Sequence, residues 1–261
     1  AFAPGGEQVQ TGTYPVTSAI AQYFGAKTLT PEKSTNYGVG FIFNPTSNFT
    51  LTVDGYLIKV KDRISITSTF DVDAADITAQ PALAAVGVGG AVAYFTNGFD
   101  TETKGIDAVA SYRTELLDNP LSFTLAYSYN KSEVTKSDPV AIGADRIYDI
   151  ENITPKHRAN VSASYEIAGF MVNARGNYYS SWSTNQDYPG QKFGSKVTAD
   201  LDVSYTLAEK YTVTVGANNL FDSHPDDFNQ RLRQTPAQQY SYLAPAAPEG
   251  TFYYTKLSYD F

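Results

Sequence analysis

The sequence predicts an all-β fold, an antiparallel transmembrane β-barrel to which this chain contributes about nine strands. Three observations predict it. Apolar and polar residues alternate with period two in segment after segment, which is the pattern of strands with one apolar face. The alternating segments run to about ten residues, roughly the length that a tilted strand needs to cross a bilayer. The connections between them alternate between short and long, as they do in outer-membrane barrels.

Each expected strand shows the same two-sided composition. In the first, Tyr37, Val39 and Phe41 alternate with small or polar neighbours, and a later one alternates Phe170 and Val172 with Asn173 and Arg175. Tyr, Phe, Leu and Val collect on one face, and Tyr is frequent near strand ends, as expected at the two membrane–water interfaces. The expected strands are residues 34–43, 49–57, 106–113, 121–130, 158–166, 170–179, 196–205, 211–218 and 253–261.

Turn residues mark the connections. Asn44 to Asn48 and Asp118-Asn119-Pro120 have turn composition. Short turns on one side of a barrel and long loops on the other predict a periplasmic and an extracellular side, respectively. Residues 1–32, rich in Gly, Pro, Thr and Gln, are expected to be an extracellular loop segment, and residues 33–261 a C-terminal portion of the barrel. The expected short turns lie near 44–48, 116–120, 167–169 and 207–210, and the long loops near 65–91, 132–153, 183–193 and 222–250.

Composition excludes several function classes. The 261 residues include 19 Lys plus Arg and 27 Asp plus Glu, a net charge of −8, which argues against a nucleic-acid partner. There is no cysteine, so disulfides, thiol catalysis and cysteine-ligated metals are excluded. No run of 18 apolar residues predicts a membrane helix. No catalytic arrangement or phosphate-binding loop stands out, so we expect neither an enzyme nor a cofactor.

Two alternatives stay open at this point. A soluble β-sandwich also has alternating strands, but these usually run to five or six residues and pack against a second sheet. A passive porin-like outer-membrane pore would use the same two-faced strands without a gated path. The polar and charged face opposite the aromatic one favours a water-filled or protein-filled lumen over a sandwich core.

Nine is an odd number of strands. An antiparallel sheet that closes on itself needs an even number if its first and last strands are to pair antiparallel, and open edges in lipid would leave backbone groups unpaired at several kcal/mol each. We therefore expect this chain to be the C-terminal part of a larger barrel.

Several segments, in this order, resemble TonB-dependent outer-membrane receptors. Gly216 to Asp222, with its Asn-Leu-Phe-Asp run, is similar to the penultimate strand of that family. The pattern Leu257, Tyr259, Phe261 is similar to the C-terminal signal that the barrel-assembly machinery reads. Residues 29–37, 54–64 and 95–107 resemble the mid-barrel strands.

This resemblance implies a 22-stranded barrel of a Gram-negative outer membrane, filled by an N-terminal plug. The plug and a TonB box are not found in this sequence. The implied function is energised uptake of a scarce nutrient such as a siderophore, cobalamin or saccharide. The implied partners are the N-terminal remainder of the receptor (plug and other strands), the TonB complex acting through the plug, outer-membrane lipid, the barrel-assembly machinery and the small-molecule nutrient.

Two sets of residues are candidate sites. Trp182, Tyr188 and Gln191 lie in one long loop, where aromatic rings could stack on a ligand; an aromatic residue at the edge of the bilayer is the alternative. Charged residues on the polar face are expected to face the lumen and contact the plug, or simply to form a hydrated wall. His224 lies near Asp222 in a loop, but one histidine in a loop does not predict a metal site. The lumen-facing set is Asp107, Arg113, Arg158, Arg175, Lys196, Asp200 and Asp202.

Overall fold

The computed structural model describes residues 10–185, 190–227, 229, 239–246 and 248–260. Its helices are α1 (Ala19–Tyr23), α2 (Ala74–Ala79), the 3-10 helix η1 (Pro81–Ala85) and α3 (Ala144–Asn152). Its strands are β1 (Thr11–Tyr14), β2 (Lys33–Thr46), β3 (Phe49–Ile66), β4 (Phe70–Asp71), β5 (Ala91–Leu116), β6 (Asn119–Ser137), β7 (His157–Ile167), β8 (Phe170–Tyr179), β9 (Trp182–Thr184), β10 (Gln191–Phe193), β11 (Lys196–Leu207), β12 (Tyr211–Asn218) and β13 (Phe252–Tyr259).

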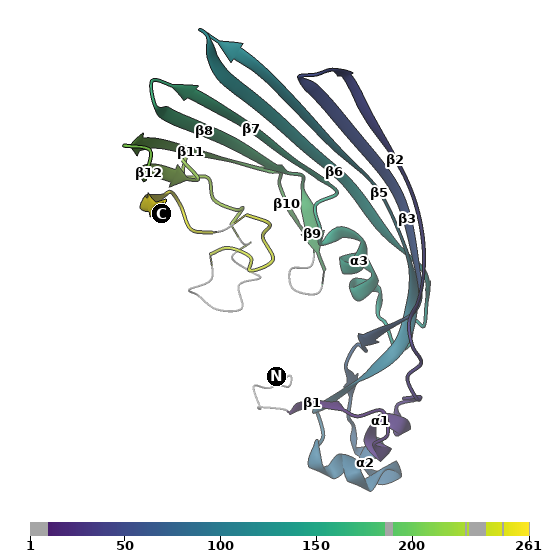
Figure 1. Ribbon diagram of the computed structural model, residues 1–261. Helices are drawn as coiled ribbons and strands as arrows, with labels where there is room; N and C mark the ends of the chain where they lie inside the picture. Colours follow the sequence, from purple (N-terminus) through teal and green to yellow (C-terminus); the bar gives the residue numbers. More distant parts are fainter. Residues whose placement is uncertain (1–9, 186–189, 228, 230–238, 247, 261) are drawn as a thin grey trace. The chain divides into compact units, whose positions relative to one another are not determined.

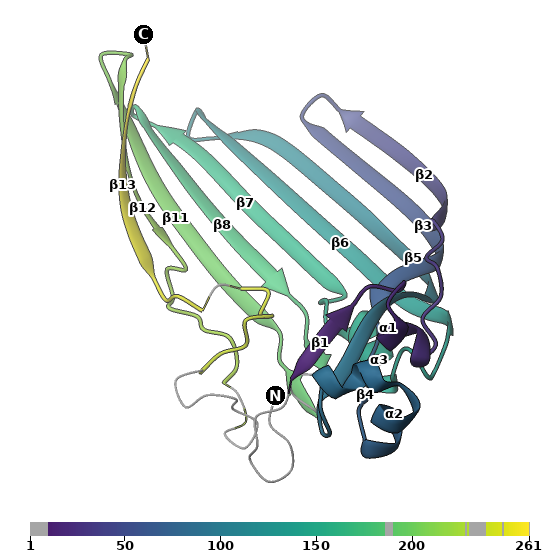
Figure 2. The ribbon, with the colours of Figure 1, turned by 90° about the horizontal axis from the view of Figure 1, so that it is seen from below.

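Nine strands follow one another through a single sheet in the order β13-β12-β11-β8-β7-β6-β5-β3-β2 (Figures 1 and 2). Strand β6 pairs antiparallel with β7, β7 with β8, β8 with β11, β11 with β12, and β12 with β13. These nine strands are the nine alternating segments of the sequence, in the same order. Over the described residues, this single sheet confirms the strand prediction and differs from the two packed sheets of a sandwich.

One face of the sheet carries exposed apolar side chains. Val161 is 51% exposed, Val197 59%, Val215 59% and Leu257 72%. In a water-soluble protein, such a broad apolar surface would be an aggregation hazard. A bilayer removes that hazard, because its hydrocarbon takes the place of a covering layer.

Tight turns close the short connections. Leu117 and Asp118 between β5 and β6 have φ of 52° and 61°, and Ala168 and Gly169 between β7 and β8 have 51° and 84°. Two consecutive left-handed residues are the requirement of a type I′ hairpin, whose twist matches that of the flanking strands. The predicted alternation of short and long connections is therefore confirmed, and which side of a membrane each occupies stays a prediction.

The chain forms two compact units. We call residues 1–36, 58–103 and 132–150 the long-loop unit, and residues 37–57, 104–131 and 151–261 the sheet unit. The long-loop unit contains the segment 65–91, which the sequence predicted to be a loop. That prediction is wrong in one respect: β4, α2 and η1 fold there around an apolar core.

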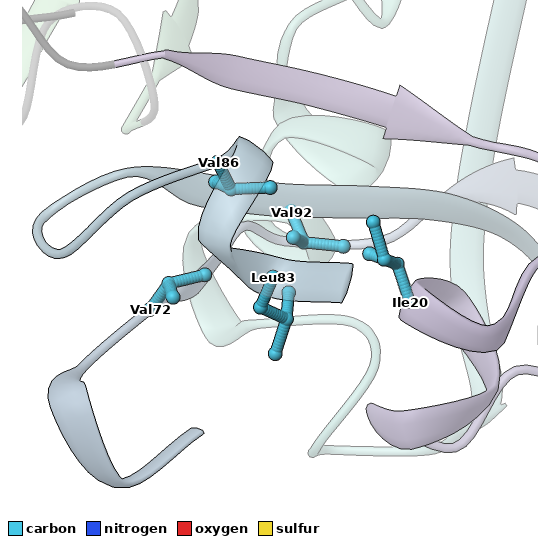
Figure 3. Packing of buried hydrophobic residues seen from close by; sticks show 5 residues of the cluster. All are labelled: Ile20, Val72, Leu83, Val86 and Val92. Carbon is cyan, nitrogen blue, oxygen red and sulfur yellow. The ribbon is translucent and has the colours of Figure 1, made fainter. Parts of the chain in front are cut away.

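Five buried residues form this core, and their side chains meet in Figure 3. Leu83 and Val92 are completely buried. Tyr14, Phe24 and Ile77 pack against the cluster from outside. A cluster of this kind gives the segment a stable fold of its own instead of an irregular path. The buried residues are Ile20, Val72, Leu83, Val86 and Val92.

Three strands are far longer than the ten residues expected, since β3 has 18 residues, β5 has 26 and β6 has 19. The period-two pattern underestimates β5 because its first four residues, Ala91 to Tyr94, are all buried. Here β1 pairs with β5 in parallel and β4 pairs with it antiparallel. A strand whose two faces are both buried has no polar face, and its sequence therefore does not alternate.

Asn97 holds the start of β5 to its surroundings within the long-loop unit. Its Nδ2 donates to the carbonyl oxygens of Thr30 at 2.8 Å and of Asp62 at 2.6 Å, and the Thr30 N–H donates to its Oδ1 at 2.8 Å. One residue later, a Cβ added at Gly98 would lie 2.6 Å from the Ile142 Cγ1. Within the segment 95–107, which resembles a mid-barrel strand of the family, Asn97 and Gly98 therefore combine a polar anchor with a close approach of backbone and side chain.

Among the described residues, no helix combines the length and the apolar character that a membrane span requires.

Candidate functional site

A polar ladder crosses three neighbouring strands of the sheet unit. Asn160 on β7 donates through Nδ2 to the Asn177 Oδ1 on β8 at 2.6 Å. Asn177 in turn donates through Nδ2 to the Asp200 Oδ2 on β11 at 3.3 Å and to the Thr198 Oγ1 at 3.2 Å. The register makes this possible, because Asn160, Asn177 and Thr198 lie directly opposite one another.

A second rung lies four residues along the strands. The Ser164 hydroxyl donates to the Asn173 Oδ1 at 2.7 Å, and the Asn173 Nδ2 donates to the Asp202 Oδ1 at 2.8 Å. Asparagine suits both rungs, since its amide accepts from one neighbour and donates to the other. Strand parity puts these asparagines on the polar face, but the alternating pattern alone does not identify them as a network. The sequence signal for this network is that asparagines recur at every second or fourth position on one face of adjacent strands.

The predicted lumen-facing charges all fall on the polar face by strand parity. Arg113, Arg158 and Arg175 are exposed, and the remaining four are half-buried. Register brings Arg175 opposite Asp200, and Arg158 and Lys196 on either side of Tyr179. Their contact with a plug stays a prediction. The half-buried residues are Asp107, Lys196, Asp200 and Asp202.

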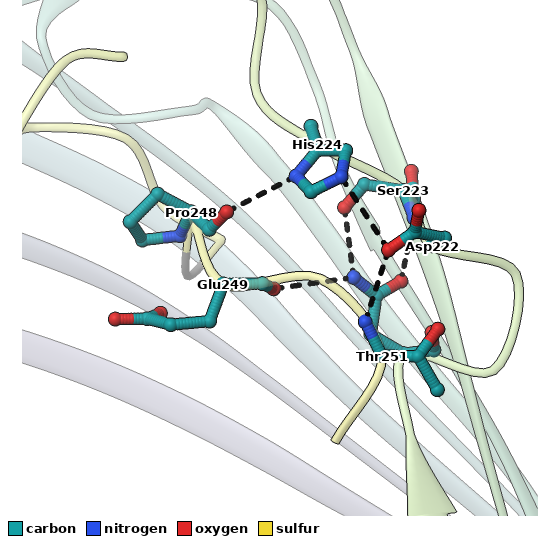
Figure 4. Close-up of polar contacts among 7 residues, drawn as sticks. Asp222, Ser223, His224, Pro248, Glu249 and Thr251 are labelled. Carbon is teal, nitrogen blue, oxygen red and sulfur yellow. Dashed lines mark hydrogen bonds and ion pairs between the residues drawn. The ribbon is translucent and has the colours of Figure 1, made fainter. Parts of the chain in front are cut away.

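Asn219 ties the long loop after β12 to the sheet unit. Its Oδ1 accepts from the Ser223 N–H and its Nδ2 donates to the Ser223 carbonyl oxygen, both at 2.9 Å. Its own N–H donates to the Asp200 Oδ1 at 2.9 Å. The loop returns through Thr251, whose hydroxyl donates to the Asn219 carbonyl oxygen at 2.9 Å and whose N–H donates to the Asp222 Oδ1 at 3.0 Å (Figure 4). The Asn-Leu-Phe-Asp run is therefore a loop anchor.

His224 belongs to the same anchor. Its Nδ1 lies 3.0 Å from the Pro248 carbonyl oxygen and its Nε2 lies 3.4 Å from the Asp222 Oδ1 (Figure 4). Its ring stacks on Tyr240, with planes 1° apart and centroids 5.5 Å apart. Both ring nitrogens therefore have protein partners. In the part of the chain that the structure describes, no three His, Asp or Glu side chains are grouped as metal ligands would be.

The aromatic candidates for ligand contact differ from one another. Trp182 on β9 is 5% exposed and stacks on Phe193 of β10, with ring centroids 4.1 Å apart. This conformation does not present the Trp182 ring to a ligand. Gln191 donates through Nε2 to the Asp227 carbonyl oxygen at 2.9 Å and accepts at Oε1 from the Asn229 N–H at 3.0 Å. Tyr188 lies outside the described residues.

The predicted assembly signal is only partly within the structure. Leu257 and Tyr259 on β13 are 72% and 42% exposed. They share the apolar face of their strand, opposite Val213 and Tyr211 of β12. Phe261 lies outside the described residues.

In the long-loop unit, Tyr23 and Asp76 form a hydrogen bond of 2.9 Å between the Tyr23 hydroxyl and the Asp76 Oδ1. Asp76 also closes the capping box of α2 with Asp73. The N–H of Asp73, followed by the Tyr23 hydroxyl, lowers the pKa of Asp76, because both hydrogen bonds favour the ionised carboxylate. The same hydrogen bond raises the pKa of Tyr23.

Comparison with known proteins identifies the architecture. A sequence model described as "TonB dependent receptor-like, beta-barrel" matches residues 1–220. The metal-pseudopaline receptor CntO of Pseudomonas aeruginosa is 32% identical over 102 residues, which are 37% of this chain and 14% of that receptor.

Solved structures with this fold cover most of the chain. The copper transporter OprC superposes with a TM-score of 0.60 and 19% identity over 90% of this chain and 32% of its own. The ferric yersiniabactin receptor FyuA from Yersinia pestis has a TM-score of 0.58 and 16% identity, and the match covers 90% of this chain and 31% of its own. The FrpB iron transporter from Neisseria meningitidis has a TM-score of 0.60 and 15% identity, and the match covers 90% of this chain and 31% of its own. At these identities the likeness concerns the fold, and this chain spans about a third of each solved chain.

The matched family model, the antiparallel sheet and its exposed apolar face all indicate the same architecture. The chain belongs to the TonB-dependent receptor family, and it forms part of the transmembrane β-barrel of such a receptor.

Proposed function

We propose that this chain is the C-terminal barrel wall of an outer-membrane receptor that imports a metal ion held by a small organic chelator. The observation that carries the proposal is a two-faced sheet that matches the TonB-dependent receptor barrel over residues 1–220. The names of the similar proteins favour metals over saccharides or cobalamin, since CntO, OprC, FyuA and FrpB are described as receptors or transporters of metal-pseudopaline, copper, ferric yersiniabactin and iron.

The two faces of the sheet have different roles in this proposal. The apolar face contacts outer-membrane lipid, and the polar face lines a lumen that the N-terminal remainder of the receptor fills with its plug. Residues 33–261 supply barrel wall, and residues 1–32 belong to the extracellular loops. The TonB complex acts through the plug, and the barrel-assembly machinery reads Leu257, Tyr259 and Phe261 during insertion.

The polar face supplies the contacts to the plug. The exposed charges Arg158 and Arg175 and the half-buried Asp107 extend from the wall that the polar ladder crosses. At the loop end, Gln191 and Tyr188 remain the candidates for ligand contact, since the Trp182 ring is covered by Phe193. A receptor that transports by this route does not need a catalytic residue.

Uptake by the whole receptor tests the proposal. The receptor with its own N-terminal region is produced in a Gram-negative host that lacks its native metal-chelate receptors, and cell-associated iron, copper, nickel and zinc are measured with a panel of chelators. We expect saturable uptake of at least one metal chelate that disappears in a host without TonB. Uptake that persists unchanged without TonB would instead favour a passive pore.

A further inference from the structure

Three polar side chains lie in one row across the sheet unit. Tyr179 on β8 is directly opposite Arg158 on β7 and directly opposite Lys196 on β11. All three have the parity of the polar face. The two cations are therefore two strands apart, about 10 Å between Cα atoms at the usual strand spacing. Arg and Lys side chains are long enough to converge on one group above the Tyr179 ring.

The charged or hydroxyl groups of these three side chains have no hydrogen-bond or ion-pair partner among the described residues. Arg158, Tyr179 and Lys196 make no side-chain hydrogen bond or ion pair to any residue that the structure describes. The next row of the same strands is different, because Asn160, Asn177 and Thr198 are joined by hydrogen bonds. The row of Arg158, Tyr179 and Lys196 therefore offers hydrogen-bond donors without acceptors, beside a row whose side chains are bonded to one another.

A third cation, Lys156, lies near this end of the polar face, and one carboxylate, Asp226, lies beside Lys196. Lys156, two residues before Arg158, donates through Nζ to the Oδ1 of the neutral Asn152 side chain at 3.3 Å. The carboxylates of Asp200 and Asp202 lie further along β11 and accept hydrogen bonds from asparagines. Asp226 lies near Lys196 but its Oδ2 accepts from the Gly194 N–H.

A hollow lined by β5, β6, β7 and β8 lies beside this row, and its lining includes Arg158 and Tyr179 but not Lys196. Its volume is about 390 Å³, within the range of small-molecule sites. Most of its lining residues have the parity of the polar face. Asp107 is the one carboxylate in that lining, so the hollow offers one anion against the cations beside it. Its polar lining includes Asp107, Ser128, Arg158, Asn160, Asn177 and Tyr179.

We propose that Arg158, Tyr179 and Lys196 bind one anionic group, a carboxylate or a phosphate, at the loop end of the polar face. Arg158 offers a planar fork that matches two oxygens of such a group, Lys196 a point charge and Tyr179 a hydroxyl donor. The assignment rests on the proposed function for its setting, a lumen entered from the loop side. The group has two sources, an external ligand such as an anionic metal chelate or a carboxylate of the receptor's own plug.

The test uses the whole receptor in detergent and pyrophosphate as the probe, followed by calorimetric titration. Arg158→Gln with Lys196→Gln removes two positive charges from the row. Lys210→Gln with Lys256→Gln removes the same charge from the turn after β11 and from β13, and is the matched control. Arg158→Lys keeps both positive charges of the row. It therefore gives a folded variant that can still be measured if the double variant fails to assemble.

Saturable pyrophosphate binding that weakens at least tenfold in the double variant, less than twofold in the control and to an intermediate extent in Arg158→Lys supports an externally filled site. If the unmodified receptor does not bind pyrophosphate, a melting temperature that falls in the double variant but not in the control assigns the site to a plug carboxylate.

Binding that survives in the double variant overturns the proposal. Absence of binding together with equal melting temperatures in all variants overturns it as well. TonB-dependent uptake is measured separately in cells, so uptake that continues while the anion site fails refutes only this assignment. Loss of TonB dependence with intact anion binding refutes the proposed function alone.

Discussion

The indole ring of Trp182 lies parallel to the phenyl ring of Phe193, with centroids 4.1 Å apart and planes 8° apart. The two rings close the β9–β10 hairpin, in which Phe193 pairs with Trp182 in register. Ile153, Leu243 and Ala244 pack against them. Three loops of the sheet unit therefore share one small apolar core.

Removing one ring tests this shared core. Phe193→Ala deletes a side chain that is 2% exposed, and a buried Phe→Ala change costs about 3–5 kcal/mol. We expect faster amide hydrogen exchange in residues 182–193 and also in 240–246, far along the chain. Val203→Ala, on the exposed apolar face, is the control and leaves both segments unchanged. Faster exchange in the hairpin alone would contradict a shared core.

The loop anchor at Asn219 permits a sharper dissection. Asn219 has a φ of 52°, which glycine adopts at little cost and alanine does not. Asn219→Gly removes only the side-chain hydrogen bonds, those to Ser223 and to the Glu249 carbonyl oxygen, worth about 1 kcal/mol each. Asn219→Ala removes them and adds backbone strain of about 1–2 kcal/mol.

Limited proteolysis of the assembled receptor measures the difference. Cleavage in residues 222–251 is expected to rise moderately in Asn219→Gly and more in Asn219→Ala. Equal cleavage in the two variants would mean that the left-handed conformation of Asn219 does not matter for the loop.

The long-loop unit depends on its own core. Leu83 is completely buried among Val72, Val86 and Val92. Leu83→Ala is expected to cost about 2–5 kcal/mol and to raise hydrogen exchange in α2 and η1. Val88→Ala, at a side chain that is 64% exposed, is the matched control. Unchanged exchange in the Leu83 variant would show that the segment is not held by this cluster.

Acid is expected to loosen α2 through Asp76. Because hydrogen bonds from Asp73 and Tyr23 lower the folded-state pKa of Asp76, the ionised form favours the folded unit. This contribution is present above the unfolded-state pKa of about 3.9 and is lost as the pH falls through the lower folded-state value. Hydrogen exchange of residues 74–79, corrected for intrinsic rates, is predicted to rise over that interval. Asp76→Ala should abolish the pH dependence, and a variant that retained it would refute the assignment.

The sheet was predictable from the sequence because its strands face two different solvents. In β8, Val172 and Ala174 on one side and Asn173 and Arg175 on the other make the period visible and also fix the register, since a slip of one residue would exchange the two faces. The same reasoning placed the candidate charges on the polar face.

The parts that sequence reasoning missed depend on contacts between distant residues. The buried start of β5 shows no alternation because both of its sides are covered. Trp182 is positioned by Phe193 and by Leu243, and no local pattern reveals that packing. The uncommitted row of Arg158, Tyr179 and Lys196 became visible only when the register was known.

The two-faced wall is tested most directly along β8. The chain contains no cysteine, so single cysteines at Val172, Asn173, Ala174 and Arg175 can carry spin labels in the receptor reconstituted into bilayers. The account predicts that labels at 172 and 174 collide mainly with dissolved oxygen, and labels at 173 and 175 mainly with a water-soluble nickel chelate. Accessibility without this alternation would contradict the assignment of the chain to a transmembrane barrel wall.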